Sequence, residues 1–440
     1  MTGRFDTFRQ RRLTFQFNDM GEALTASAVL EKDMSKSKSS VRQSGPLVGL
    51  KVLDLSTIIS APLAATLLAD YGAEVLKVEL PRVGDSVRSY PPLKDDVSLW
   101  WKVANRNKKF ITLDVRHPDG LALMKKLIGK FDVLVENFRP GTLDKWGLSK
   151  DILWELQPRL IILRCTAFGQ TGPYRNRPGF TRVFEAMSGV AYITGEPDHE
   201  PMHMGFHIGD AVGGVFGALG ILTALWKRAR DPKQPGEEID LSLTEAMLRL
   251  VDFLPIEYDQ LGLVRERIGN SNHFSAPTLV CKTCNGQWVS MSGGNTAVFQ
   301  NNCRAIGRED MINDTRFITS TARAENKDLL NRIFRDWIGE RHFSEVISRF
   351  EAAGGALAPV YSIDQIFTDP QMIAREAIVS VPDDDFGEVR MQNVVPRFTR
   401  EPGAVRSSAG RLGSDNDEIY GTWLGLSVEE RERLSEEKII

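Results

Sequence analysis

Cysteine is scarce in this chain, and neither sign of charge is in excess. Only four of the 440 residues are cysteine, at positions 165, 281, 284 and 303. Four are too few for a disulfide framework and are typical of a reducing compartment, so we expect a cytoplasmic protein. The formal net charge is −3. The sequence therefore lacks the basic excess of a nucleic-acid-binding surface, and no nucleic-acid partner is expected.

Long apolar runs are missing as well. The one candidate for a membrane span, Ala211–Trp226, falls short of the roughly 20 apolar residues that a span requires and contains four glycines. It is typical of a buried helix, and no membrane partner is expected. The first 45 residues are polar and mixed in charge, without the apolar core of a secretory signal, and they predict a flexible extension over 1–45.

The turn after the first predicted strand contains no glycine. It runs from Ser56 to Pro62, where a dinucleotide-binding protein would carry its GxGxxG fingerprint, so binding of NAD or FAD by that route is excluded. The surrounding pattern still alternates strands and helices, which predicts an α/β fold with a parallel sheet covered on both faces. The expected strands are 51–55, 74–79, 110–114, 132–136 and 160–165, and the expected helices are 62–71 and 119–130.

The pattern changes past residue 265. Asn285-Gly286 lies between two short runs and predicts a hairpin of strands 278–281 and 287–291. Helices are expected over 295–306, 326–339 and 343–353, a second hairpin over 386–399, and a surface helix over 429–438. The predicted organisation is an extension over 1–45, a large domain over 46–230, a linker over 231–264, a small α+β domain over 265–365 and a return to the large domain over 366–440.

Two groups of residues have the composition of metal ligands, but neither has a suitable setting. Cys281 and Cys284 form a single CxxC, which is half of a closed zinc site, so ordinary strand cysteines are favoured. The segment His203–Asp210 has an H-x3-H-x2-D pattern, but the proline and glycine around it argue against a helix. Neutral loop histidines that line a pocket are the favoured interpretation, and no metal is expected.

Asn105–Lys109 is a basic run just before a predicted strand. Such a run is usually a solvated loop, and the alternative is a contact for phosphates. Strand ends are where an open parallel sheet binds its ligands, and further cations near them occur at Arg82, Arg88, Arg116, Arg139 and Lys145. Together they favour an anionic, phosphorylated ligand.

Asp210 lies between a mixed segment and the uncharged run 211–226. Asp is a preferred N-cap residue, so a helix cap and a chemically poised carboxylate both fit this position. The positive end of the helix would favour the ionised form of the side chain. The four glycines of the run would let another backbone approach the helix closely.

These segments together resemble the class III CoA-transferases. The resemblance runs from about Gly45 to the end of the chain, and its landmarks are Gly49–Ser56, Gly72–Glu79, Gly84–Arg88, Asn107–Asp114, Asp132–Gly141, Phe168–Pro173, Ala186–Gly189 and Gly209–Asp210. It implies a Rossmann-like large domain built from both chain ends and a smaller α+β domain. It also implies an interlocked homodimer whose active site lies between domains of the two subunits.

The resemblance implies the site and the reaction as well. Asp210 matches the family's catalytic aspartate, and the positions that match CoA contacts are Ile58, Ile59, Ser60, Leu113, Arg116, Asn137, Phe138 and Lys145. The implied enzyme moves CoA from an acyl-CoA to a free carboxylic acid through an anhydride and a thioester on Asp210. Coenzyme A is then part of the substrate, and no tightly bound cofactor is expected.

Two departures from the family pattern bear on the substrate. Phe180 stands where the related α-methylacyl-CoA racemases have a histidine, which disfavours a racemase. Ile59 stands where formyl-CoA transferase has a glutamine, which disfavours formyl-CoA and oxalate. The alternatives are a racemase or isomerase on the same scaffold and a catalytically silent CoA-binding protein. The sequence leaves the acid open, with a small dicarboxylate such as succinate as a first guess.

Overall fold

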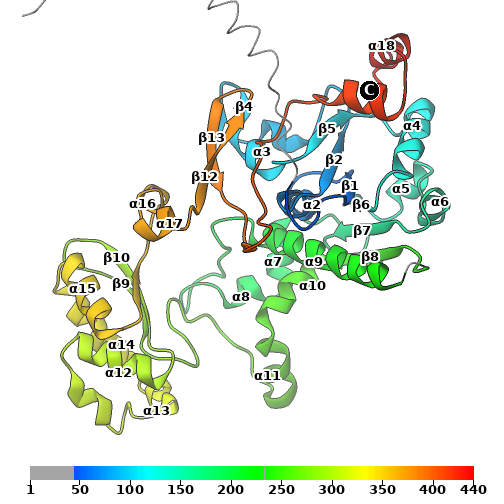
Figure 1. Ribbon diagram of the computed structural model, residues 1–440. Coiled ribbons are helices and arrows are strands. Elements are labelled where there is room, and N and C mark those ends of the chain that lie inside the picture. The colour runs from blue at the N-terminus through cyan, green and yellow to red at the C-terminus, as the bar shows by residue number, and fades with distance from the viewer. Residues whose placement is uncertain (1–43, 232) are drawn as a thin grey trace, which may run out of the picture. The chain divides into compact units, whose positions relative to one another are not determined.

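The computed structural model describes residues 44–231 and 233–440 (Figure 1). Nearly all of the predicted extension 1–45 lies outside these residues. The described chain is a mixed α/β fold whose largest element is a six-stranded sheet of order β5-β2-β1-β6-β7-β8. Every pair of neighbouring strands in this sheet is parallel, as the sequence predicts.

Five strands of the sheet confirm the sequence prediction: β1 (Lys51–Asp54), β2 (Glu74–Glu79), β5 (Lys109–Thr112), β6 (Val133–Glu136) and β7 (Ile161–Thr166). The sixth, β8 (Glu237–Ser242), lies in the stretch 231–264, where the prediction of a linker is therefore wrong. Acidic residues mask this edge strand in the sequence. Glu238 is paired with Lys150 at 3.0 Å and with Arg164 at 2.8 Å, which offsets part of that charge.

The sheet has a hydrophobic core on each face. Successive side chains of a strand point to opposite faces, so Val52 lies in one core and Leu53 in the other. The Val52 face is covered by α2 (Ser60–Asp70), α9 (Ile208–Arg230) and α10 (Leu243–Leu248). The Leu53 face is covered by α4 (Pro118–Ile128), α6 (Lys150–Leu156) and the C-terminal segment.

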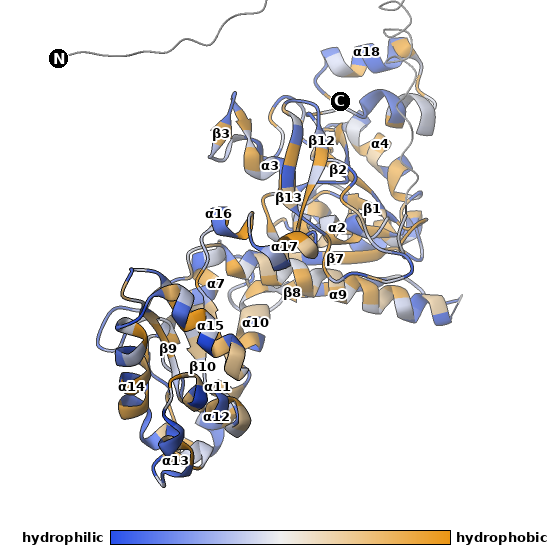
Figure 2. Cartoon of the chain, turned by 60° about the vertical axis from the view of Figure 1, so that its left-hand side comes forward, coloured by the Kyte–Doolittle hydropathy of each residue, from blue (hydrophilic) through white to orange (hydrophobic). Residues whose placement is uncertain are grey.

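Helix α9 approaches α2 closely because glycines lie at the contact. A Cβ on Gly214 would lie 2.8 Å from Leu63 Cβ, and a Cβ on Gly213 would lie 2.4 Å from Ser60 Oγ. The close approach that the glycines predict is therefore confirmed. Within the described residues α9 is the one helix long and apolar enough to cross a membrane. Figure 2 shows that this helix is mostly hydrophobic up to its charged last turns. In the folded chain it packs on α2, β7 and β8.

The C-terminal segment packs along the β5 edge of the sheet. Phe110 N donates to Asp415 Oδ2 at 2.8 Å, and the Tyr420 hydroxyl donates to Thr112 O at 2.6 Å. The chain then ends with α18 (Val428–Glu436), close to the surface helix predicted over 429–438. A hairpin of β12 (Ile378–Asp383) and β13 (Gly387–Gln392) precedes this segment, so the prediction over 386–399 is displaced and captures only the second strand.

Residues 278–359 form a smaller antiparallel sheet with a core of its own. β9 (Thr278–Lys282) and β10 (Trp288–Ser292) confirm the predicted hairpin, and β11 (Leu357–Pro359) adds a third strand. Helices α12 (Thr296–Ala305), α14 (Lys327–Gly339) and α15 (Phe343–Ala353) supply the rest of the core. Cys281 and Cys303 are buried in it as free thiols, and Cys284 is exposed.

Short elements complete the described chain. They are η1 (Ser86–Ser89), β3 (Leu93–Lys94), β4 (Val97–Ser98), α3 (Leu99–Ala104), α5 (Thr142–Lys145), α7 (Thr181–Met187), α8 (Val190–Ile193), η2 (Arg249–Val251), α11 (Phe253–Leu261), η3 (Glu309–Asn313), α13 (Ser320–Glu325), α16 (Ile363–Ile366), α17 (Pro370–Ala374) and the π-helical turns η4 (Asp417–Trp423). Of these, α7 matters most below, because it packs on the first turn of α9.

The contact between α2 and α9 predicts a difference between two glycines of one helix. Gly214→Ala should lower the free energy of unfolding by about 1–3 kcal/mol, because its Cβ meets a branched side chain at its base. Gly220→Ala is the matched control, since its Cβ meets only the two methyl groups of Ile239, at 3.2 and 3.7 Å, and the substitution gains about 1 kcal/mol of helix propensity. Denaturant unfolding measures both, and equal effects would contradict the proposed contact.

Candidate functional site

The turn between β1 and α2 is fixed by side chains that follow the two neighbouring strands. Thr57 N donates to Asn137 Oδ1 at 2.8 Å, and Asn137 Nδ2 donates back to Thr57 O at 2.7 Å. Ile58 N donates to the Asp85 carboxylate, 3.1 Å from Oδ2. Ile58 has φ +70°, a left-handed conformation that is strained for a β-branched residue. The neighbouring strands therefore impose a conformation that the sequence of the turn disfavours.

A cage of buried charges lies beneath this turn. Lys77 Nζ donates to Ser56 O at 2.7 Å and is paired with Asp85 at 3.1 Å. Lys108 is paired with Asp54 at 2.8 Å. All four charged side chains are buried, and Asp54 is completely inaccessible to solvent. Each charge has a partner of opposite sign, and this pairing offsets the free-energy cost of removing the charges from water.

Two cations of the basic run Asn105–Lys109, Arg106 and Lys108, are buried. Arg106 binds Asp70 through two hydrogen bonds of 3.0 and 2.6 Å, and Lys108 lies against Asp54. A solvated loop and a phosphate contact are therefore both wrong for these two cations. Burial lowers the pKa of Lys108 to about 8, although the charge of Asp54 opposes the shift.

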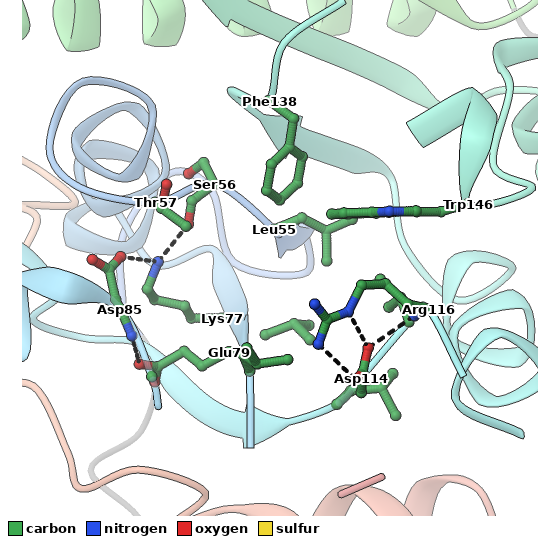
Figure 3. Close-up of a pocket in the computed structure, with 15 residues that line it drawn as sticks. Leu55, Ser56, Thr57, Lys77, Glu79, Asp85, Asp114, Arg116, Phe138 and Trp146 are labelled. Atoms are coloured by element: carbon green, nitrogen blue, oxygen red, sulfur yellow. Dashed lines mark hydrogen bonds and ion pairs between the residues drawn. The ribbon is translucent and has the colours of Figure 1, made fainter. Parts of the chain in front are cut away.

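A first cavity of about 250 Å³ opens at the carboxyl ends of β1, β2 and β5 (Figure 3). Leu113, Arg116 and Phe138, three of the expected CoA contacts, line it. Phe138 packs edge-on against Trp146, with ring centroids 4.9 Å apart. The exposed Arg116 binds Asp114 through two hydrogen bonds of 2.7 Å. The cavity thus offers aromatic surface and a cation held at its mouth.

A second cavity of about 240 Å³ adjoins the first, because Thr57 and Phe138 line both. Arg175 and Arg177 give it positive charge. The expected site residues that line this second cavity are Ile58, Ile59, Ser60, Asn137, Phe138 and Asp210. Segments far apart in the sequence are thereby brought together around the Asp210 carboxylate.

Asp210 lies within the first turn of α9 and is not its cap. The N-cap residue is His207, and the helix start has no side-chain cap hydrogen bond, so a capping role for Asp210 is wrong. Glycine is required at position 209, directly before Asp210, for a steric reason. A Cβ at that position would lie 2.3 Å from the ring of Phe184, which α7 presses against the helix start.

The surroundings of Asp210 favour its protonated form. Burial raises the pKa of Asp210 to about 6; the charge of Glu185 adds to the shift, and a hydrogen bond from Thr181 opposes it. The expected help from the helix end is outweighed by desolvation. Burial also raises the pKa of the neighbouring Cys165 thiol to about 12, so this thiol is no competing nucleophile near neutral pH.

The two expected loop histidines each have a partner. His203 Nδ1 lies 2.8 Å from Oε2 of the buried Glu185. His207 is stacked on Trp100 with ring centroids 4.2 Å apart, and burial lowers its pKa. It lines a third cavity of about 660 Å³, which shares Ile59 with the second. Over residues 44–231 and 233–440, no three His, Cys, Asp or Glu side chains are placed to hold a metal ion.

Lys145 lies apart from the other expected contacts. It lines a polar cavity of about 800 Å³ with Arg139, Lys150 and Arg164. Arg139 also lines the cavity of Asp210, so the two spaces adjoin.

Four residues near the site escape the sequence analysis, namely Lys77, Asp85, Thr181 and Glu185. The sequence pointed only to Lys77 and Asp85, because these two residues lie in the landmark segments Gly72–Glu79 and Gly84–Arg88. The role of Thr181 and Glu185 depends on how α7 packs on α9, which no local pattern shows.

Comparisons with known proteins show what the chain is similar to. The profile of CoA-transferase family III matches residues 47–416. The succinyl-CoA–D-citramalate CoA-transferase of Chloroflexus aurantiacus is 39% identical over 403 residues, which cover 91% of this chain and 100% of that protein. The succinate–glutarate CoA-transferase of Agrobacterium fabrum is 32% identical over 347 residues, which cover 77% and 86% of the two chains.

A solved structure shares the fold. The crystal structure of a CaiB/BaiF family protein from Brucella suis superposes with a TM-score of 0.75 at 30% identity, and covers 86% of this chain and 99% of its own. The likeness in sequence and in structure thus extends over most of the described chain. The chain belongs to CoA-transferase family III.

Proposed function

We propose that this CoA-transferase uses Asp210 as the covalent carrier in moving CoA from an acyl-CoA thioester to a free carboxylic acid. The observation that carries the proposal is the place of the Asp210 carboxylate in a cavity that adjoins a second one at the strand ends. The nucleotide end of an extended acyl-CoA can lie over the carboxyl ends of the strands, where Arg116 is available, while its thioester reaches Asp210.

The reaction balances without an added reactant. An Asp210 oxygen attacks the thioester carbonyl, the C–S bond breaks, CoA leaves as a thiolate, and a mixed anhydride remains. The thiolate attacks the aspartyl carbonyl, and the donor acid leaves as a carboxylate. The acceptor carboxylate then attacks the aspartyl thioester, the C–S bond breaks, CoA leaves again as a thiolate, and a new anhydride remains. The returning thiolate takes the acceptor acyl group, which frees the Asp210 carboxylate.

Each addition creates an oxyanion that needs hydrogen-bond donors. Ile59 is the N-cap residue of α2 and Ser60 is its first residue, and neither backbone N–H has an acceptor among the described residues. Both residues line the Asp210 cavity. Backbone donors at a helix start are suited to a developing negative charge. The half-buried setting of Asp210 also limits hydrolysis of the anhydride.

The acceptor that fits this cavity best is a dicarboxylate. Arg175 and Arg177 line it, and a guanidinium binds a carboxylate through two parallel hydrogen bonds. The compared relatives are named for succinate or succinyl-CoA and for D-citramalate or glutarate, and the free acids among these are dicarboxylates. A racemase is disfavoured, because Phe180 lines the cavity and offers no proton acceptor.

Transfer is tested directly with succinyl-CoA and a set of small dicarboxylates. The purified protein should form a new CoA ester, detected by mass spectrometry. Asp210→Ala should abolish transfer and still bind CoA in calorimetry, whereas Asp336→Ala, an exposed aspartate on α14, should change little. If Asp210→Ala kept more than about a tenth of kcat, a loss of under about 1.4 kcal/mol in the barrier, Asp210 would not be the carrier.

The pH dependence of transfer should report the raised pKa of Asp210. Below about pH 6 its carboxyl group is protonated and cannot attack, so kcat/KM should rise with pH up to about 6 and then level off. The phosphomonoester of CoA also titrates near pH 6. A donor that lacks this phosphate is therefore the control and should give the same acidic limb. A limb near pH 4 would contradict the raised pKa.

The surface of a single chain supports a homodimer. Val215, Leu219 and Trp226 lie on one face of α9 and are 57%, 56% and 67% exposed. The nearby helix α11 has no buried residue, although Ile256, Tyr258 and Leu261 are large and apolar. Monomers rarely expose so much apolar surface, and a second copy of the chain is the partner that the family resemblance implies. We infer that the two chains interlock.

Light scattering at decreasing concentration tests this assembly. The expected mass is twice the 49.2 kDa of one chain at every concentration at which the protein is folded, because interlocked chains separate only by unfolding. A folded and active species of 49.2 kDa would exclude the dimer as a requirement for the active site.

A further inference from the structure

Asp85 lines the first cavity, which adjoins the Asp210 cavity, and its carboxylate is held from several directions. The side chain is 1% exposed. It accepts hydrogen bonds from Ile58 N at 3.1 Å and from Val87 N at 3.1 Å, and it is paired with Lys77 at 3.1 Å. Its own N–H donates to Glu79 Oε2 at 2.9 Å. Asp85 therefore has a single well-defined position from which it can hold another group.

The bond to Ile58 is the one that matters for the turn. Thr57, the residue before it, is already held by Asn137, and the N–H groups of Ile59 and Ser60 after it point to no acceptor in the described chain. The left-handed conformation of Ile58 costs on the order of 1–3 kcal/mol and persists only when surrounding groups impose it. The Asp85 carboxylate is the group that accepts the Ile58 N–H.

Lys77 completes the arrangement. Its ammonium group donates to Ser56 O at 2.7 Å, at the start of the same turn, while it neutralises Asp85. Lys77 is 1% exposed, so its charge is directed to these groups rather than to solvent. One cation and one carboxylate thus bind the turn at Ser56 and at Ile58.

We propose that Asp85, oriented by Lys77, is a positioning residue for CoA transfer: by holding Ile58 in its left-handed conformation it sets the backbone path of Ile59 and Ser60 along the Asp210 cavity. The inference rests on the proposed function. It assigns Asp85 no contact with the reacting atoms. Loss of the carboxylate should therefore slow the chemical step more than it weakens the binding of CoA.

The first test compares two buried aspartates. Asp85→Asn should lower kcat at least thirtyfold and change the dissociation constant of CoA, measured by calorimetry, less than threefold. Asp70→Asn is the matched control, because Asp70 is equally buried and paired with Arg106 but does not touch the turn. The control should keep kcat within threefold. Equal losses of kcat in the two variants, or a loss in Asp85→Asn that appears only as weaker CoA binding, would overturn the proposal.

The second test is a double-mutant cycle with Ile58→Gly, which also guards against failure to fold. Glycine adopts a positive φ without strain, so the turn no longer depends on Asp85 to impose it. Asp85→Asn should then reduce kcat at least threefold less in the Ile58→Gly background than in the wild-type background. Equal reductions in both backgrounds would show that Asp85 does not act through residue 58.

The outcome also separates this inference from the proposed function. If wild-type protein transfers CoA and Asp210→Ala does not, the carrier role of Asp210 stands. An unchanged kcat in Asp85→Asn would then contradict only the positioning role of Asp85. If Asp210→Ala remains active, the carrier role fails whatever Asp85→Asn does.

Discussion

The site depends on a buried network of opposite charges beneath one strained turn. Asp54 and Lys108 bind the two ends of the turn, at Ser56 N and Pro62 O, and Asp85, paired with Lys77, holds its left-handed residue. Removing one member of such a network leaves an unpaired charge in the interior. This loss destabilises a protein far more than replacing the whole network with apolar residues. The turn beside the Asp210 cavity is thus determined by residues on β1 and β2 and in the segments next to β2, β5 and β6, and not by its own conformational preferences.

A second constraint brings Asp210 to this turn. Helix α9 can lie against α2 because glycines at the contact leave no Cβ in the way. Gly209 has the same steric effect, because the absence of a Cβ there makes room for Phe184 beside Asp210. Small residues therefore set the distance between the carboxylate and the start of α2, and large apolar residues on the outer face of α9 stay exposed in the single chain.

Asp210 shows how burial and helix position compete. The start of a helix favours a negative charge, typically by 0.3–1 kcal/mol. Desolvation in the cavity outweighs this effect and raises the pKa of the side chain to about 6. A carboxylate with such a pKa is largely ionised at neutral pH and yet less stabilised by solvent than an exposed aspartate. That balance suits the carrier role proposed for Asp210.

The sequence by itself determined the strands of the parallel sheet, the hairpin of the small sheet and the position of Asp210 in its glycine-rich segment, because periodicity, turn residues and motif order are local signals. It failed at β8, where acidic residues mask an edge strand, and at the cap of α9, where the helix begins before Asp210. Tertiary structure alone decided that Lys108 and Arg106 are buried, that Asp85 holds Ile58, and that Thr181 and Glu185 flank Asp210. Each of these is a contact between segments distant in the chain, and the free energy that selects it comes from burial and charge pairing in the folded interior.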